Sequence, residues 1–331
     1  MTILREKSYL YYYLLSLFFI TLYYLSALNI VETYNAMTEW LINYQGGFVR
    51  RGFLGEILFR ISKFLEIDLK FSILLVQLTT YGTFYYLVFR LVKNIEIGYL
   101  FLFIIFSPIF LFYPIAELEA IGRKEILVSI LFLSISIFFR DNKDYKLLLF
   151  LFGSIIVLLT HEIIVFYFFN FLVFFLLFNK NNSLNFNIKI IIVFIIFIIF
   201  TSKIFFNEYP IFMKEMMCES LIQNCDVKCG FQTHYVANPI TTYINEVNWK
   251  SVHFIRNSLI YLIGFGPLLI FSFFLKFNKN VCNYLFINFP IIILLLCFSI
   301  INLLIFFISV DTGRYFHLAY SNNFIFIFGL I

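Results

Sequence analysis

The chain has 331 residues, of which 62% are hydrophobic, 22% aromatic and only 13% charged, with a formal net charge of +5. A soluble globular domain is excluded, because so few polar residues cannot cover its surface. The composition predicts an all-α, polytopic integral membrane protein, a helical bundle that forms a single membrane domain over 1–331.

About ten transmembrane helices are expected, because roughly 20 consecutive apolar residues cross ~30 Å of hydrocarbon. The first span follows a short basic segment without a small-residue cleavage site, so we interpret it as a retained anchor with a cytoplasmic N-terminus. The expected spans are 8–30, 71–90, 97–115, 125–139, 147–160, 162–178, 188–206, 257–275, 284–309 and 318–331.

The apolar stretch 147–178 is too long for one untilted helix, and His161-Glu162 divides it into two short pieces. We therefore place a break there. If the stretch were one tilted helix instead, every later loop would change sides of the membrane. With the break, the short turns assigned to the cytoplasm are basic, as expected for inside loops, although a raw count of Lys and Arg alone does not favour this orientation.

Two segments outside the membrane are long enough to fold, a first periplasmic segment at 31–70 and a long periplasmic loop at 207–256. Within the first, the apolar positions of 54–65 recur at helical spacing and predict a helix that lies at the membrane interface. In the second, Cys218, Cys225 and Cys229 predict one disulfide with one thiol left over. Zinc binding that includes His234 is the alternative.

The most distinctive motif is Gly46-Gly47-Phe48-Val49-Arg50-Arg51-Gly52. Glycines permit positive φ and close backbone approach, and two adjacent guanidinium groups offer the forked donors that suit phosphate oxygens. A diphosphate at the membrane surface is the ligand that this pattern favours. The alternative is an interfacial turn whose arginines reach lipid headgroups.

Three further charged clusters lie on the same predicted side of the membrane. His161-Glu162 interrupts an apolar run, where ionisable groups are costly and usually mark a site. Ion pairing alone could explain the cluster at 117–125, since Glu119 and Arg123 have the four-residue spacing of a helical pair. The third cluster is Asp311 and Arg314, which follow a long span. Glu32 and Glu39 lie on the same predicted side, after the first span.

Carboxylates, a histidine and several arginines around a membrane-surface cavity fit transfer from a polyprenyl-linked donor. Arginines would neutralise the leaving diphosphate, and a carboxylate or histidine would remove the proton from the attacking sugar hydroxyl. The sequence offers no glycine-rich phosphate loop and no nucleotide-binding fingerprint. We expect no cofactor, no metal ion and no nucleic-acid partner.

The ordered series of Asn43 to Gly52, Gly122-Arg123-Lys124-Glu125, His161-Glu162 and Asp311-Thr312-Gly313-Arg314 resembles bacterial O-antigen and capsule polymerases of the Wzy type. The resemblance implies an inner-membrane enzyme of lipopolysaccharide or capsule biosynthesis. It would join undecaprenyl-diphosphate-linked oligosaccharide units on the periplasmic face, with membrane lipid and a chain-length regulator protein as partners. Arg50, Arg51, Arg123 and Arg314 would then hold diphosphate, and His161 or Glu162 would be the base.

These arguments give two groups of candidate residues. The candidate catalytic residues are Glu32, Glu39, His161, Glu162 and Asp311, and those expected to bind diphosphate or glycan are Gly46, Gly47, Arg50, Arg51, Arg123, Lys124 and Arg314.

Three other functions fit the same sequence. A GT-C-type glycosyltransferase would use a sugar on a polyprenyl phosphate and would also place an acid after the first span, a role for Glu32 or Glu39. A flippase for the lipid-linked unit would need polar groups through the bundle, and Gln77, Asn170 and Asn302 leave this open. An acyltransferase is favoured by the His-Glu pair but lacks a clear acyl-donor site.

Overall fold

All regular structure in the part of the chain that the structure describes is α-helical, which confirms the all-α class. The computed structural model describes residues 2–31, 35–93, 95, 99–118, 120–138, 144–168, 184–206, 212–221, 265–268, 270 and 312–330.

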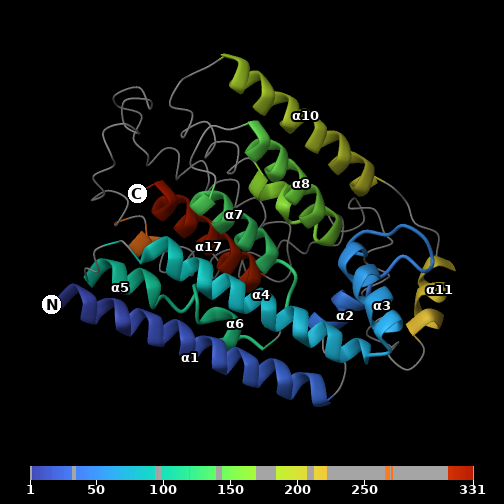
Figure 1. The fold of residues 1–331 in the computed structure, drawn as a ribbon, viewed down its shortest axis with the longest axis horizontal. Coiled ribbons are helices and arrows are strands. Elements are labelled where there is room, and N and C mark those ends of the chain that lie inside the picture. The colour runs from blue at the N-terminus through green and yellow to red at the C-terminus, as the bar shows by residue number, and fades with distance from the viewer. Residues whose placement is uncertain are drawn as a thin grey trace, which may run out of the picture.

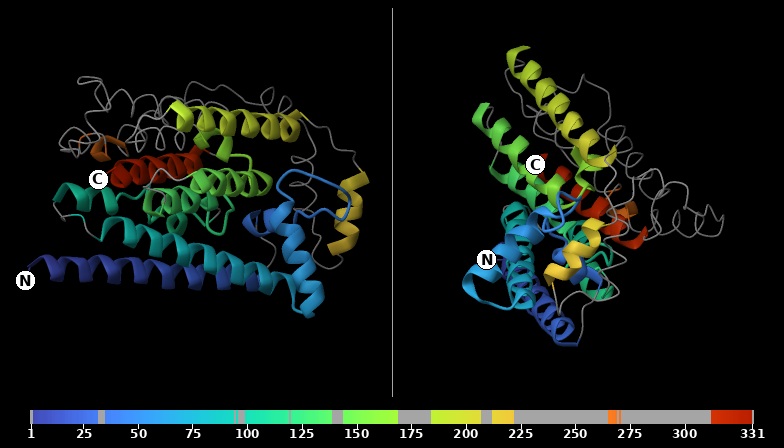
Figure 2. Two further views of the ribbon diagram at one scale, coloured as in Figure 1. Left: turned by 45° about the horizontal axis from the view of Figure 1, so that its top comes forward. Right: turned by 90° about the vertical axis from the view of Figure 1, so that its right-hand side faces the viewer.

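Long helices lie side by side and form the body of the protein (Figure 1). Helix α4 packs against α1 on one side and against α7 on the other, and α17 packs against α7. Helix α8 contacts α7, and α10 in turn packs on α8 (Figure 2). The bounds are α1 Thr2–Val31, α4 Leu69–Val92, α7 Ile126–Phe138, α8 Asp144–Thr160, α10 Leu184–Phe206 and α17 Thr312–Leu330.

The short helices α2, Asn35–Leu41, α3, Phe53–Leu65, and α11, Phe212–Leu221, gather where α1 ends and α4 begins, far from the N-terminus (Figure 1). A small apolar core that includes Trp40, Leu58 and Met217 joins them. These helices therefore build one end of the bundle, as expected for segments outside the membrane.

Two of the described helices are long and apolar enough to cross a membrane, the Ser8–Asn29 part of α1 and Leu69–Val92. Helices α7 and α8 are apolar but shorter. Most of the expected spans 257–275 and 284–309 lies outside the described residues. The number of about ten spans therefore stays a prediction.

The expected span 97–115 is not one continuous helix. Helix α5, Tyr99–Ile105, ends early, and turns lead to the short α6, Tyr113–Ala116. Pro108 explains the break, because proline lacks an N–H donor and disfavours helical backbone in the residue before it. The chain between α5 and α7 is therefore a folded loop, and this loop carries several site residues.

The predicted break at His161-Glu162 is confirmed. Helix α8 ends at Thr160, residues 161–163 form a turn, and the chain is helical again at 164–168. The turn leaves both polar side chains at the end of a helix instead of in its middle.

The helix predicted at 54–65 is also confirmed, as α3. It buries Leu58 but leaves Ile61 and Phe64 exposed, Phe64 by 86%. An exposed apolar face on an otherwise charged helix is the pattern of a helix that lies in a membrane interface. On α11, Cys218 is disulfide-bonded, as expected for this segment, and its partner lies outside the described residues.

The double-glycine turn at 46–47 packs directly on α11. A β-carbon added to Gly46 would lie 2.2 Å from the main-chain oxygen of Met213, and Gly47 has a φ of 120°. The carboxylate of Glu56 anchors the start of this turn by accepting hydrogen bonds from the Tyr44 amide, at 2.9 Å, and from the Gln45 side chain. The glycines thus allow a close helix–turn contact.

Gly46→Ala is expected to destabilise the protein by about 1–3 kcal/mol, because the new methyl group overlaps backbone that cannot move away independently. The measurement is the apparent melting temperature of the purified protein in detergent. Gly266→Ala is the matched control, since a β-carbon there meets no atom of the described residues within 4 Å. Equal melting temperatures for the two variants would contradict the packing argument.

Candidate functional site

Nine ionisable residues from five separate segments meet at one end of the bundle. We call them the charged cluster. The segments are α2, the turn after it, the loop before α7, the turn after α8 and the start of α17. The cluster comprises Glu39, Arg50, Arg51, Arg123, Lys124, Glu125, His161, Glu162 and Arg314.

Glu39 lies at the centre of the cluster and is only 2% exposed. Its Oε1 atom is paired with Arg123, and Nη1 atoms of Arg51 and Arg314 lie 3.7 Å and 4.0 Å away. Three guanidinium groups from three segments thus converge on one carboxylate oxygen. The other oxygen, Oε2, is buried and accepts no hydrogen bond from the described residues.

Glu125 forms a second centre. Arg314 Nη1 donates to its Oε1 at 2.9 Å, and His161 Nε2 lies 3.5 Å from the same oxygen. The Ile163 amide donates to His161 Nδ1, so the ring proton is placed on Nε2, toward Glu125. Burial raises the pKa of the Glu125 carboxyl, but His161 and Arg314 outweigh burial and hold this pKa well below its ordinary value. Glu125 is therefore an ionised, buried carboxylate.

Glu162 is bound by Arg51. The Arg51 Nε atom lies 2.9 Å from Oε1 and 2.8 Å from Oε2, and Nη2 also contacts Oε1. Burial raises the pKa of Glu162, but the charge and hydrogen bonds of Arg51 lower it far more. A carboxylate with a strongly lowered pKa is a poor proton acceptor, so this geometry favours a role for Glu162 in orienting Arg51 over the expected role as base.

Arg51 has a φ of 63°, in the left-handed region that non-glycine residues rarely adopt. Lys124 holds this conformation, because its Nζ donates to the Arg51 carbonyl oxygen at 2.8 Å. Lys124 is fully buried and also lies over the Trp40 ring, 5.5 Å from its centroid. Expected to bind substrate, Lys124 instead supports the backbone of a residue that faces the cluster.

Burial lowers the pKa of Lys124 to about 7, from an ordinary value of 10.5. Between these two pH values the unfolded chain binds more protons than the folded protein, so the stability of the folded protein rises with pH across this window. We expect the melting temperature of the wild type to rise relative to Lys124→Met as the pH is raised from 7 toward 10. Lys63→Met, on the exposed face of α3, is the control. Parallel curves for wild type and Lys124→Met would contradict the lowered pKa.

Gly122 fixes the loop that carries Arg123, and its φ of 79° is one that glycine adopts without strain. Its carbonyl oxygen accepts hydrogen bonds from Trp40 Nε1, at 2.7 Å, and from Gln77 Nε2, at 3.0 Å. Its amide donates to the Tyr81 hydroxyl at 3.1 Å. Gln77, considered above as part of a translocation route, thus bonds to the loop of the site.

Three expected site residues or partners, Glu32, Glu119 and Asp311, lie outside the described residues. Gly46 and Gly47, expected to bind substrate, instead lie against Met213 of α11. The other predicted residues meet in the cluster. They are Glu39, Arg50, Arg51, Arg123, Lys124, His161, Glu162 and Arg314.

Sequence reasoning left Glu125 out of the candidate residues, although it closes the Gly122 to Glu125 motif. The signal was its place beside Arg123, which was attributed to local ion pairing. Instead, Arg123 pairs with Glu39 and Glu125 pairs with Arg314, both across long sequence separations. Tyr81 carried no signal in the sequence, because Phe and Tyr are abundant throughout the chain, and Trp40, one of only two tryptophans, lies in no charged motif.

Among the described residues, the cluster contains four arginines, one lysine and three carboxylates, and most of these side chains are buried. One oxygen each of Glu39 and Glu125 and one nitrogen of His161 lie within 4.8 Å of one another, a spacing that a metal ion could bridge. Guanidinium groups already contact both carboxylates, however, and the excess charge is positive. The arrangement is therefore better matched to an anion.

Comparison with known proteins adds no relative. No family model, no curated protein and no solved structure matches the chain at a significant level.

Proposed function

We propose that the charged cluster binds the diphosphate of a polyprenyl-linked glycan. The protein is then a bacterial inner-membrane glycan polymerase that joins undecaprenyl-diphosphate-linked oligosaccharide units on the periplasmic face. The observation that carries the proposal is the excess of basic residues in a buried cluster built from distant segments. Arg50, at 4% exposure, and Arg123, at 7%, are both buried within it.

Basic side chains outnumber carboxylates among the described residues of the cluster, and such a balance favours a bound anion. Arginine suits diphosphate because its planar fork donates to two oxygens at once. Arg51, Arg123 and Arg314 reach the centre from three different segments, which would allow them to surround a diphosphate. Such fixed donors would stabilise the charge that develops as the diphosphate leaves.

In the proposed reaction the acceptor hydroxyl oxygen forms a bond to the anomeric carbon of the donor sugar. The bond between that carbon and the diphosphate oxygen breaks, and the diphosphate keeps the electron pair. The proton of the hydroxyl goes to a carboxylate. We assign this role to Glu39, since its Oε2 atom is buried and accepts no hydrogen bond from the described residues.

The surface supports the membrane location. Tyr12 and Tyr23 on α1 are 64% and 68% exposed, Phe152 on α8 is 64% exposed, and Ile191 and Ile199 on α10 are more than half exposed. Large apolar side chains on several helices are typical of a surface that faces lipid. Glu39 of the cluster belongs to α2, and α2 and α3 gather at one end of the bundle (Figure 1), as the proposed site at the membrane surface requires.

The test is the length distribution of surface polysaccharide, resolved on a gel, in a host deleted for the gene. Loss of the ladder while single repeat units are still displayed is the result expected of a polymerase. Loss of the units themselves would point to a transferase or a flippase, and an unchanged ladder would remove the polysaccharide function altogether.

A GT-C-type transferase is the second candidate, and the position of Glu39 favours it. This acid follows the first long helix closely and lies at the centre of the cluster, where such an enzyme is expected to have its acid. The two candidate functions differ in the glycosyl donor, which is a diphosphate-linked oligosaccharide for the polymerase and a sugar on a polyprenyl monophosphate for the transferase. Purified protein that transfers a single sugar from a polyprenyl monophosphate, and leaves a diphosphate-linked unit unused, would support the transferase over the polymerase.

A further inference from the structure

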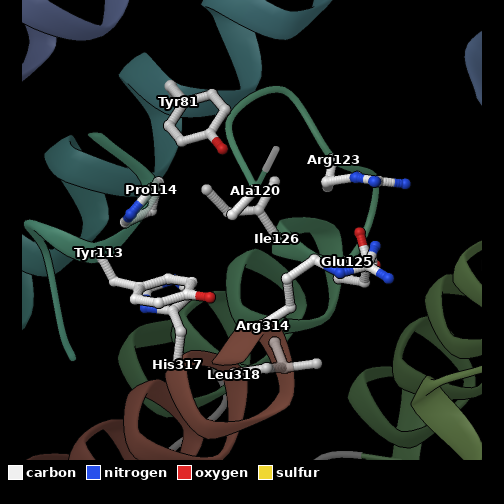
Figure 3. A pocket seen from close by; sticks show the side chains of 10 residues that line it. All are labelled: Tyr81, Tyr113, Pro114, Ala120, Arg123, Glu125, Ile126, Arg314, His317 and Leu318. Atoms are coloured by element: carbon white, nitrogen blue, oxygen red, sulfur yellow. Dashed lines mark hydrogen bonds and ion pairs between the residues drawn. The ribbon is translucent and has the colours of Figure 1, made fainter. Parts of the chain in front are cut away.

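A pocket opens directly beside the charged cluster, between α4, the loop before α7 and the start of α17 (Figure 3). Its cavity volume is about 30 Å³, and it is open on one side. Arg123, Glu125 and Arg314 line one side of it. The pocket therefore begins where the proposed diphosphate would lie.

The rest of the pocket wall is mainly apolar. Pro114, Ala120, Ile126 and Leu318 contribute hydrocarbon, and the ring of Tyr113 lies across from the arginines (Figure 3). A cavity with guanidinium groups at one side and hydrocarbon at the other is complementary to a molecule that joins an anion to an apolar chain.

The aromatic wall is held in place from behind. The Tyr113 ring stacks on His317, with ring centroids 5.4 Å apart and an interplanar angle of 17°. The Nδ1 atom of His317 is hydrogen-bonded to the Ile109 carbonyl oxygen at 2.9 Å. Because the stack joins α17 to α6, and the hydrogen bond joins α17 to the loop between α5 and α6, the wall is preformed and needs little ordering when a ligand binds.

We propose that this pocket holds the isoprene unit bonded to the diphosphate of the lipid-linked substrate. The inference rests on the proposed function and adds the orientation in which the lipid-linked substrate binds. With the prenyl chain on the Tyr113 side and the diphosphate at Arg123 and Arg314, the glycan extends the other way, toward Glu39 and Arg51. The sugar carbon that reacts then lies on the side of the arginines where Glu39 can accept the proton.

A sugar ring is the competing occupant, and the lining argues against it. A pyranose carries hydroxyl groups on most of its carbons, and each one buried without a partner costs binding free energy. On the side away from the arginines, Pro114, Ala120, Ile126 and Leu318 have no polar side-chain atom to offer, and the polar groups of this part of the lining are the Tyr81 and Tyr113 hydroxyls and the His317 ring. An isoprene unit carries no polar group, so the same surface stabilises it through apolar burial alone.

The experiment is calorimetric binding to the purified full-length protein in lipid nanodiscs, with empty nanodiscs as blank. The probes are inorganic pyrophosphate, geranyl diphosphate and glucose 1-phosphate. We expect geranyl diphosphate to bind at least about tenfold more tightly than pyrophosphate, from the burial of one isoprene unit. Ala120→Leu, which fills the pocket, should remove this advantage and leave pyrophosphate binding unchanged.

Two further variants make the result specific. Tyr113→Ala removes the aromatic wall and should also weaken geranyl diphosphate selectively. Leu118→Ala is the matched control, because Leu118 belongs to the same loop but is 44% exposed and does not line the pocket. Retained pyrophosphate binding shows that each variant is folded.

The outcomes separate the two proposals. Equal affinity for geranyl diphosphate and pyrophosphate would overturn the prenyl pocket while the diphosphate site stands. Glucose 1-phosphate that binds more tightly than geranyl diphosphate, and loses affinity in Tyr113→Ala, would assign the pocket to a sugar. No binding of any probe would overturn the diphosphate site, and the proposed function with it.

Discussion

Glu39→Gln is expected to lower the rate of polymerisation by about 10²–10⁴-fold, the range typical for loss of a general base. Glutamine has nearly the same shape, and its amide oxygen can still accept a hydrogen bond from Arg123. The substitution removes a negative charge from a cluster that is already positive, so binding of pyrophosphate should be retained or strengthened. The combination of lost activity and retained anion binding would identify Glu39 as the group that accepts the proton.

The measurement pairs the polysaccharide ladder of cells complemented with each variant with calorimetric binding of pyrophosphate to the purified protein. Glu66→Gln is the control, because Glu66 lies at the exposed end of α3, away from the cluster. A normal ladder from cells that carry Glu39→Gln would remove Glu39 from the reaction.

Arg123→Ala and Arg314→Ala are expected to lower activity by about 10²–10³-fold each, as for loss of one donor to a developing anion. Both should also weaken pyrophosphate binding, which distinguishes them from Glu39→Gln. The alanine variants leave a buried carboxylate less compensated, so their expression and melting temperature need to be measured alongside. Arg123→Lys, which keeps the charge and loses the fork, should show an intermediate defect.

Arg60→Ala is the matched control for these arginines, because Arg60 is exposed on α3 and pairs with Glu56, outside the cluster. Polymer length that is unchanged in each of Arg50→Ala, Arg123→Ala and Arg314→Ala, in protein that still inserts, would refute a shared diphosphate site.

The positions of most helices could be predicted from the sequence, because a run of apolar residues long enough to cross a membrane excludes most other structures. The runs at 8–30, 71–90 and 125–139 correspond closely to α1, α4 and α7. The break at His161-Glu162 was predicted for the same reason, since polar groups end an apolar run. The prediction was wrong at 97–115, where the apolar run concealed a break at Pro108.

The charged residues of the site stood out in the sequence because they are rare in it. Which of these residues pair with one another could not be predicted, because spacing in the sequence indicates only partners that are close in the chain. Among the described residues, Arg123 pairs with Glu39, which lies 84 residues earlier in the chain and is a partner that local spacing does not indicate. Likewise, His161 and Glu162 are adjacent but turn to different partners, Glu125 and Arg51.

By itself the sequence determined the all-α fold class, the approximate course of the described helices and most of the residues that gather in the cluster. Composition and the lengths of apolar runs act locally, so one chain is enough to reveal them. Only the tertiary structure decided that Glu125 belongs to the site, that Lys124 supports Arg51, and that Tyr113 and His317 wall a pocket beside the arginines. These depend on contacts between segments tens to hundreds of residues apart, and such contacts leave no periodic signal in the sequence.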